Sequence, residues 1–188
     1  AGFDYRFGYK ALGNSNYLKE LGEKYNFETN IIMPIYIDAE IVSSTKIRNL
    51  IKIGEIKKAN EFLGRPYSLV GNVVKGDQRG SKMGYPTANI QLSYNYAIPK
   101  TGVYETITLI ENKKFVSLTN IGYNPTFNGK KLKIENHIID FNEDIYSRKI
   151  EIKFMDFIRE DIKFNTMKEL IGKIAEDINY IKDKNIYN

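Results

Sequence analysis

The sequence contains no cysteine and no tryptophan, and it has a single histidine, His137. Without cysteine, the chain can form neither disulfide bonds nor thiolate metal sites. A metal site built on several histidines is excluded as well. The lack of cysteine fits the reducing environment of the cytoplasm, where we expect this chain to be located.

The sequence also lacks any apolar run that approaches the roughly 18 residues of a membrane span, and its first residues do not form a signal peptide. Hydrophobic residues make up 42% and charged residues 27%, a balance typical of globular proteins. We therefore expect a globular chain with no membrane partner. Because the sequence starts abruptly with Ala1 rather than methionine, we also expect it to be a piece of a longer protein.

The net charge is +5, so the surface is expected to be basic. A basic surface attracts nucleic acid, but it also attracts ATP and other phosphates. The lysines are scattered along the chain rather than gathered in one arm, which argues against nucleic acid as the partner. A nucleic-acid-binding β-barrel remains an alternative, supported by the charge and by 13% aromatic residues, and it predicts salt-sensitive binding of single strands.

The first third of the chain has mixed helical and strand patterns. The spacing predicts a helix over residues 15–26, and the apolar, β-branched run 31–37 predicts a strand. The hydroxyl residues 43–45 can cap the start of a second helix, which Gly54 would end. A third helix is expected over residues 56–63.

The periodicity of apolar residues changes at Gly64-Arg65-Pro66, from every three or four residues to every second residue. We place a domain boundary there, which gives domains 1–63 and 64–188. Several short strands at close spacing indicate an antiparallel sheet or a small barrel. The predicted strands, with a hairpin turn at Asn112-Lys113, are 67–75, 102–110, 114–121, 131–141 and 149–158.

The last predicted element is a helix over residues 166–181. Thr166 and Glu169 have the spacing of a capping box. An apolar stripe runs along this helix, and we expect the stripe to cover an open side or an end of the barrel. Its residues are Leu170, Ile171, Ile174, Ile178 and Ile181.

A glycine-containing loop, residues 76–82, precedes the most distinctive segment of the chain, residues 84–89 (Gly-Tyr-Pro-Thr-Ala-Asn). Glycines allow backbone N–H groups to approach an anion closely. The loop is not a Walker A loop, because only three residues separate Gly76 from Gly80 and Ser81-Lys82 stand in reverse order. A phosphate cradle of another type and a plain hairpin loop are the two interpretations.

Thr87 and Asn89 lie two residues apart, so on an extended segment both side chains share one face. A hydroxyl and an amide oxygen are ligands that suit Mg²⁺, which commonly accompanies nucleotide phosphates. This pair favours the phosphate interpretation of the loop.

Glu135 lies in a segment that alternates as a strand, with Ile134 and Ile138 on one face and Glu135 and His137 on the other. A partly desolvated carboxylate on a rigid strand can act as a general base toward a hydroxyl nucleophile. An ordinary solvent-facing glutamate is the alternative. His137 either supports Glu135 or has a structural role, and we favour the structural role.

Glycine, proline and asparagine dominate residues 120–129, which predicts a long turn between strands. Tyr123 and Phe127 in this segment either cover a planar ligand or pack the loop against the domain.

Residues 64–182 resemble the riboflavin kinase domain, and the shared segments agree in order and spacing. Residues 2–8 and 43–48 are similar to the second half of the FMN adenylyltransferase domain. Bacterial bifunctional riboflavin kinase/FAD synthetases carry both domains in this order. The kinase resemblance rests on Gly64–Tyr67, Gly71–Gly76, Arg79-Gly80, Gly84–Asn89, Gly102–Tyr104, Asn120–Phe127, Glu135–His137, Asp140-Phe141, Phe157–Arg159 and Lys163-Phe164.

The resemblance implies a mainly β fold, an antiparallel six-stranded Greek-key β-barrel with a C-terminal helix, preceded by a truncated α/β nucleotidyltransferase segment. It implies transfer of the γ-phosphate of ATP to the riboflavin 5′-hydroxyl, assisted by Mg²⁺, with ADP and FMN as products. The expected partners are therefore ATP and riboflavin and not nucleic acid, and we expect a monomer.

The resemblance also implies roles for individual residues. Glu135 would accept the proton of the riboflavin hydroxyl, while Thr87 and Asn89 would place Mg²⁺. Tyr123 and Arg159 would bind the flavin. The residues that would bind ATP and its phosphates are Gly76, Arg79, Gly80, Lys82, Gly84, Pro86, Thr87 and Asn89.

The N-terminal segment departs from the adenylyltransferase pattern. It lacks the early strand and the His-x-Gly-His turn, and a chain with one histidine cannot hold that turn elsewhere. Ser44, Thr45 and Arg48 match a residual phosphate-contacting motif. We expect kinase activity but no FAD synthesis from this chain, and both activities from the full-length parent. A flavin- or nucleotide-binding module without catalysis remains an alternative.

Overall fold

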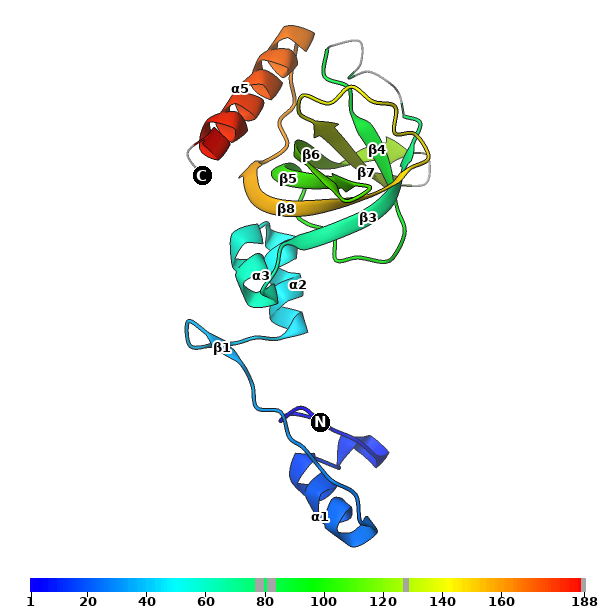
Figure 1. Cartoon of the computed structure of the whole chain (residues 1–188), viewed down its shortest axis with the longest axis vertical. Coiled ribbons are helices and arrows are strands. Elements are labelled where there is room, and N and C mark those ends of the chain that lie inside the picture. Colours follow the sequence, from blue (N-terminus) through cyan, green and yellow to red (C-terminus); the bar gives the residue numbers. More distant parts are fainter. Residues whose placement is uncertain (77–79, 81–83, 127–128, 187–188) are drawn as a thin grey trace. The chain divides into compact units, whose positions relative to one another are not determined.

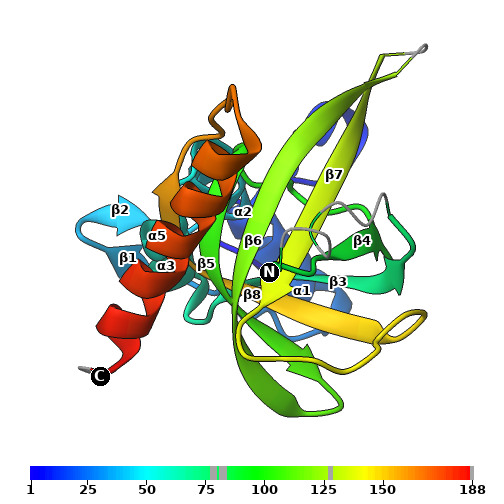
Figure 2. The ribbon, with the colours of Figure 1, turned by 90° about the horizontal axis from the view of Figure 1, so that it is seen from above.

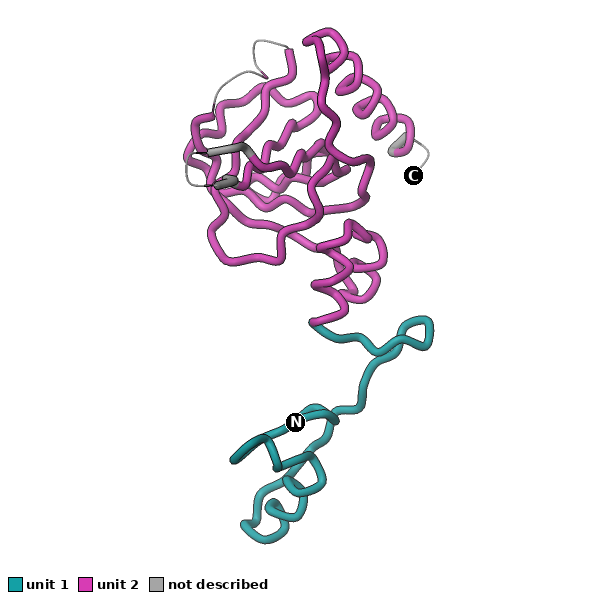
Figure 3. The backbone as a smooth tube through the Cα atoms, turned by 180° about the vertical axis from the view of Figure 1, so that it is seen from behind, with its two compact units in different colours: residues 1–44 teal, residues 45–188 magenta. Residues whose placement is uncertain are grey.

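The structure is a computed structural model that describes residues 1–76, 80, 84–126 and 129–186. Arg79 and Lys82, two of the predicted phosphate ligands, lie outside the described residues. The chain divides into two compact units, unit 1 (residues 1–44) and unit 2 (residues 45–188) (Figure 3). Within the described ranges, no helix is long and apolar enough to cross a membrane.

Unit 1 contains the predicted helix, α1, whose start is fixed by a side-chain cap. The Asn14 side chain accepts a hydrogen bond from the Tyr17 N–H at 2.9 Å, which pairs one of the free N–H groups of the first turn. The elements of this unit are η1 (Tyr9–Ala11), α1 (Ser15–Tyr25), β1 (Tyr36–Ile37) and β2 (Glu40–Ile41).

The strand predicted over residues 31–37 is wrong for most of its length. Only Tyr36 and Ile37 pair in a ladder, with β2, and Ile32 forms one isolated bridge with Gly2. An apolar, β-branched run becomes a strand only where a neighbouring segment supplies continuous hydrogen-bond partners.

The next two predicted helices are confirmed as α2 (Ser44–Ile53) and α3 (Ile56–Leu63). Gly54 and Gly64, which follow them, have φ values of +88° and +67°, in the left-handed region that favours glycine. Helix α3 packs against β3 and β8 of the barrel (Figure 1). The Asn60 side chain strengthens this contact, because its amide donates to the Phe154 carbonyl at 2.8 Å.

Six antiparallel strands close into a barrel, which confirms the expected fold class (Figures 1 and 2). The order around the barrel is β3-β4-β7-β6-β5-β8, so strands that are distant in sequence become neighbours. The strands are β3 (Tyr67–Val74), β4 (Ala88–Leu92), β5 (Gly102–Ile110), β6 (Lys113–Thr126), β7 (Gly129–Ile138) and β8 (Lys149–Arg159).

Strand β4 is absent from the strands predicted by the sequence pattern. It has five residues and begins directly after Pro86-Thr87, so its apolar alternation is too short to detect. It is stabilised by pairing on both sides, with β3 and β7, and Asn89 lies opposite Val74 and Glu135.

The long turn predicted for residues 120–129 is wrong for residues 120–126, and Phe127, one of its two predicted ligand-covering residues, lies outside the described residues. Strand β6 continues to Thr126 and pairs in unbroken register with β7, which begins at Gly129. The cross-strand pairing therefore overrides the turn preference of glycine, asparagine and proline. The tight turn between β5 and β6 is at Glu111-Asn112, one residue earlier than predicted, and both residues have positive φ values, 48° and 70°.

The alternation along the strands gives the barrel an inner face that is partly polar. Five inward-facing polar residues are fully buried and hydrogen-bonded to one another. The Asn136 amide donates to Thr119 Oγ1 at 2.9 Å, and Thr108 Oγ1 donates to Asn136 Oδ1 at 3.0 Å. The cluster consists of Thr106, Thr108, Ser117, Thr119 and Asn136, and the rest of the interior is mainly apolar.

Helix α5 (Met167–Ile186) begins at the predicted cap, because Thr166 Oγ1 accepts from the Glu169 N–H at 3.2 Å. The helix packs on the outer face of the barrel rather than over an open side or an end, since the six strands already close on themselves (Figure 2). Ile178 and Ile181 of its apolar stripe belong to a second buried cluster, together with Val103, Leu118 and Ile139.

The buried polar cluster predicts a specific effect on stability. The substitution Asn136→Leu removes two buried hydrogen bonds and should lower the free energy of unfolding by about 1–3 kcal/mol, measured by urea denaturation. The control Asn72→Leu, at an exposed position of β3, should change it by less than about 0.5 kcal/mol. Equal stability of the two variants would contradict this account of the interior.

Candidate functional site

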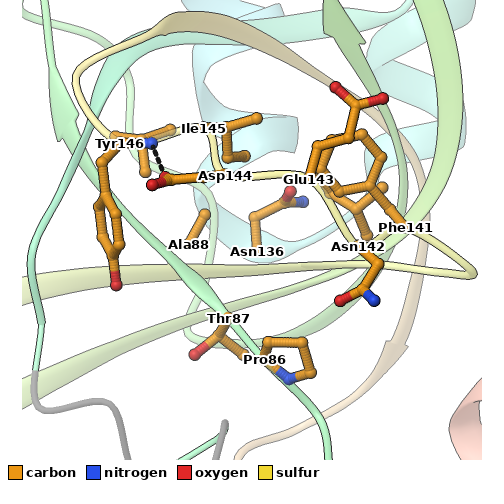
Figure 4. Close-up of a pocket in the computed structure, with 12 residues that line it drawn as sticks. Pro86, Thr87, Ala88, Asn136, Phe141, Asn142, Glu143, Asp144, Ile145 and Tyr146 are labelled. Carbon is orange, nitrogen blue, oxygen red and sulfur yellow. Dashed lines mark hydrogen bonds between the residues drawn. The ribbon is translucent and has the colours of Figure 1, made fainter.

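Two cavities of unit 2 meet at the segment that precedes β4. The barrel-end cavity, of about 260 Å³, combines inner-face residues of the barrel with the loop 141–146 (Figure 4). The outer cavity, also about 260 Å³, lies against the outer face of the barrel and is lined in part by Leu170 and Ile174 of α5. Thr87 lines both cavities, so it marks the place where they adjoin.

Consecutive residues of β7 line the two different cavities, because the side chains of a strand alternate between its faces. Asn136 faces the barrel interior and lines the barrel-end cavity, and Figure 4 shows it beside Ala88, with Thr87 and Pro86 on the same wall. Glu135 faces outward and lines the outer cavity.

Gly76 and Gly80, the described residues of the predicted phosphate loop, lie close to the Thr-Ala-Asn segment. A β-carbon at Gly76 would lie 2.0 Å from Asn89 Nδ2, and one at Gly80 would lie 2.4 Å from the Tyr85 carbonyl oxygen and 3.2 Å from Thr87 Oγ1. Any larger residue at these two positions would therefore separate the loop from the segment. The structure thus brings Gly76 and Gly80 to Asn89 and Thr87, and the phosphate interpretation of the loop stays a prediction.

The residues between the loop and β4 are held by a turn and by His137. Gly84 has a φ of +83°, a conformation that favours glycine. His137 Nδ1 donates to the Pro86 carbonyl at 2.8 Å, and its ring lies edge-on to the Tyr85 ring with centroids 5.6 Å apart. His137 thus has the structural role favoured by the sequence analysis.

Glu135 is about one-quarter exposed, and Lys133 Nζ lies 2.9 Å from its Oε1. The two residues share the outer face of β7, and both line the outer cavity. Glu135 is registered opposite Asn89 on β4 and Asn120 on β6. The carboxylate is thus accessible from the outer cavity and close in register to the predicted metal ligand.

Arg159, at the end of β8, lines the outer cavity and is bound by α5. Its Nε lies 2.9 Å from Asp177 Oδ2, and a second guanidinium nitrogen lies 2.8 Å from the same oxygen. The Asp177 side chain is 3% exposed. The other predicted flavin contact, Tyr123, is 48% exposed and lines neither cavity, so its role stays a prediction.

The predicted metal ligands have different surroundings. Thr87 lines both cavities, whereas Asn89 lines neither and lies against Gly76. In the part of the chain that the structure describes, no group of three or more histidine, cysteine or acidic residues could hold a metal ion. Neutral oxygens such as those of Thr87 and Asn89 fit Mg²⁺ when phosphate oxygens complete its ligands.

The residual motif residues Ser44, Thr45 and Arg48 are exposed in the first turns of α2. Their assignment to a phosphate-contacting motif stays a prediction.

The outer cavity and its surroundings contain residues that the sequence analysis missed. Lys133 was detectable, because it precedes Glu135 by two residues on the same strand face. Asn120 belongs to a segment that carries the family resemblance, but nothing in the sequence gave it a role of its own, and Asp177 gave no signal, since each reaches the site only through tertiary packing. The apolar lining includes Leu118, Phe164, Leu170 and Ile174.

The fold and the site define a closed antiparallel β-barrel with a carboxylate accessible from a cavity on its outer face, and comparison with known proteins identifies the family. Residues 63–185 match the family model described as riboflavin kinase, and residues 1–46 match the one described as FAD synthetase. The chain belongs to the riboflavin kinase family.

Curated relatives in two bacteria are named bifunctional riboflavin kinase/FMN adenylyltransferase. The protein of Listeria monocytogenes is 39% identical over 94% of this chain, and that of Buchnera aphidicola subsp. Schizaphis graminum is 40% identical over 96%. The chain spans only 56% and 59% of the length of these relatives.

A solved structure from Streptococcus pneumoniae, named a macrolide-efflux protein, is 34% identical to this chain with a TM-score of 0.88. It covers 96% of this chain, and the chain covers 58% of it. The likeness supports the fold, while the efflux function in the name concerns that protein alone.

We expect the Arg159–Asp177 ion pair to stabilise the packing of α5 on the barrel. Asp177→Ala would leave a largely buried guanidinium without its carboxylate and should lower the free energy of unfolding by about 3 kcal/mol, measured by urea denaturation. Asp183→Ala, at an exposed position of the same helix, is the matched control and should be nearly neutral. A neutral Asp177→Ala would show that the pair does not hold the helix.

Proposed function

We propose that this chain is a riboflavin kinase, which transfers the γ-phosphate of ATP to the 5′-hydroxyl of riboflavin. The observation that carries the proposal is that Thr87 lines two cavities. One of them is lined by Asn136 and the other by Glu135. A transfer between two substrates requires that their reacting atoms meet, and two adjoining sites provide this proximity.

The barrel-end cavity is the proposed ATP site. It adjoins the segment against which Gly76 and Gly80 pack, where loop N–H groups can approach phosphates. Its wall combines apolar residues such as Val73 and Phe141 with polar groups such as Asn142, a mixture that suits a nucleotide base.

The outer cavity is the proposed riboflavin site. Its apolar lining, with Phe164, Leu170 and Ile174, suits the flavin ring, and Arg159 supplies a polar group fixed by Asp177. Glu135 would then lie near the ribityl chain of the flavin, on the side facing Thr87.

In the proposed reaction the riboflavin 5′-oxygen attacks the γ-phosphorus, and the bond from this phosphorus to the β,γ-bridging oxygen breaks. The Glu135 carboxylate accepts the proton of the attacking hydroxyl, and ADP leaves with the bridging oxygen. Thr87 and Asn89 would hold Mg²⁺, which neutralises phosphate charge when bound. Lys133, 2.9 Å from Glu135, would fix the direction of the carboxylate.

We further propose that the chain does not adenylylate FMN. The single histidine, His137, is on β7 of the barrel and is bound to Pro86. A His-x-Gly-His turn therefore cannot form within this sequence.

Incubation of the chain with riboflavin, ATP and Mg²⁺, followed by chromatography of the flavins, tests both proposals. We expect FMN and ADP to accumulate and FAD to be absent, also when FMN replaces riboflavin. Folded protein that yields no FMN would refute the kinase, and FAD formed from FMN would refute the second proposal. Binding of flavin without turnover would instead identify a non-catalytic module.

Glu135→Gln tests the general base. The amide keeps the size of the side chain but cannot accept the proton in the same way, so kcat should fall by about 100-fold or more. The KM for ATP should change little, because Glu135 lines the outer cavity. Glu151→Gln, on β8 and outside both cavities, is the control and should retain activity. A Glu135→Gln enzyme with near-normal kcat would remove Glu135 from the mechanism.

A further inference from the structure

Asn120 is an outward-facing residue of β6 that lines the outer cavity. It is registered between Val103 of β5 and Glu135 of β7, so it is the direct cross-strand neighbour of the proposed base. Side chains opposite one another on the same face of neighbouring strands have β-carbons about 4.5–5.5 Å apart. A ligand that reaches Glu135 therefore passes within reach of Asn120.

The amide oxygen of Asn120 is shielded from solvent, and it has no hydrogen-bond partner among the residues that the structure describes. Buried acceptors are almost always paired, and an unpaired one destabilises the fold. Asn136, on the inner face, shows the contrast, because its amide oxygen accepts from Thr108 and its amide nitrogen donates to Thr119.

On the side of β5 and earlier along β6, the same-face neighbours of Asn120 are apolar. Leu118, two residues earlier on the same face, and Val103 belong to the apolar cluster under α5. An apolar side chain at position 120 would thus continue the packing without leaving an unpaired oxygen. The missing partner is therefore best sought in the molecule that occupies the outer cavity.

We propose that Asn120 Oδ1 accepts a hydrogen bond from the 4′-hydroxyl of the ribityl chain, next to the 5′-hydroxyl that is phosphorylated. This assignment rests on the proposed riboflavin kinase function. A carboxamide oxygen needs a donor, which a sugar-alcohol hydroxyl provides and an ionised phosphate does not. Because Asn120 and Glu135 are cross-strand neighbours, they can bind hydroxyls on adjacent carbons, and Asn120 would thereby align the nucleophile with its base.

The test compares Asn120→Leu with the wild-type chain by flavin-fluorescence titration and by urea denaturation. The Kd for riboflavin should rise about tenfold in the variant, whereas the Kd for 4′-deoxyriboflavin, which lacks the hydroxyl concerned, should be the same in both proteins. The KM for ATP should not change. Stability should stay equal or increase, because the variant loses an unpaired acceptor, while the control Asn136→Leu should be less stable.

Several outcomes would overturn the proposal: an unchanged Kd for riboflavin, an equal rise for riboflavin and its 4′-deoxy analogue, or a loss of stability like that of Asn136→Leu. If Asn120→Leu fails to fold, the smaller variant Asn120→Ala is measured in the same two titrations. The change in its Kd for riboflavin relative to that for 4′-deoxyriboflavin then tests the proposal. Failure of the wild-type chain to form FMN would refute the kinase function itself. FMN formation with normal riboflavin binding by the variants would refute only the role of Asn120.

Discussion

Closure of the six-stranded barrel is the constraint on which the site depends. In a closed sheet every strand has two neighbours, so no residue can change faces without breaking two ladders of hydrogen bonds. This fixes Asn136 inside the barrel and Glu135 outside, one residue apart. The proposed ATP and riboflavin sites therefore lie on opposite faces of the same strand, and Thr87 lines both of them.

The two faces are maintained by different kinds of interaction. On the inner face, four hydroxyl side chains and Asn136 bond to one another, so burying them leaves none of their oxygens without a partner. On the outer face, His137 binds the Pro86 carbonyl, and this contact holds the segment that carries Thr87 against β7. The hydrogen-bonded interior and the segment bound by His137 together define the surface against which Gly76 and Gly80 lie.

Helix α5 supplies the remaining wall of the outer cavity and is attached to the barrel at three levels. Leu170 and Ile174 line the cavity, the Asp177 carboxylate binds Arg159, and Lys184 near the end of the helix hydrogen-bonds to Glu105 and Asp156. Partial burial lowers the pKa of Lys184, but these two carboxylates more than offset that effect and raise its pKa above the usual value. The ammonium thus stays charged, and the proposed flavin site depends on a helix held by both apolar and ionic contacts.

The local features could be predicted from the amino-acid sequence: the helix ends at Gly54 and Gly64, the cap at Thr166, the alternation that exposes Glu135, and the proximity in sequence of Gly76 and Gly80 to Thr87 and Asn89. These depend on spacing and on conformational preference within a few residues. Three features became visible only in the folded chain: the short strand β4, the continuation of β6 through residues 120–126, and the positions of Asn120 in the outer cavity and of Asp177 against Arg159. Each of these depends on a partner far away in the sequence, and neither spacing nor local preference contains the position of that partner.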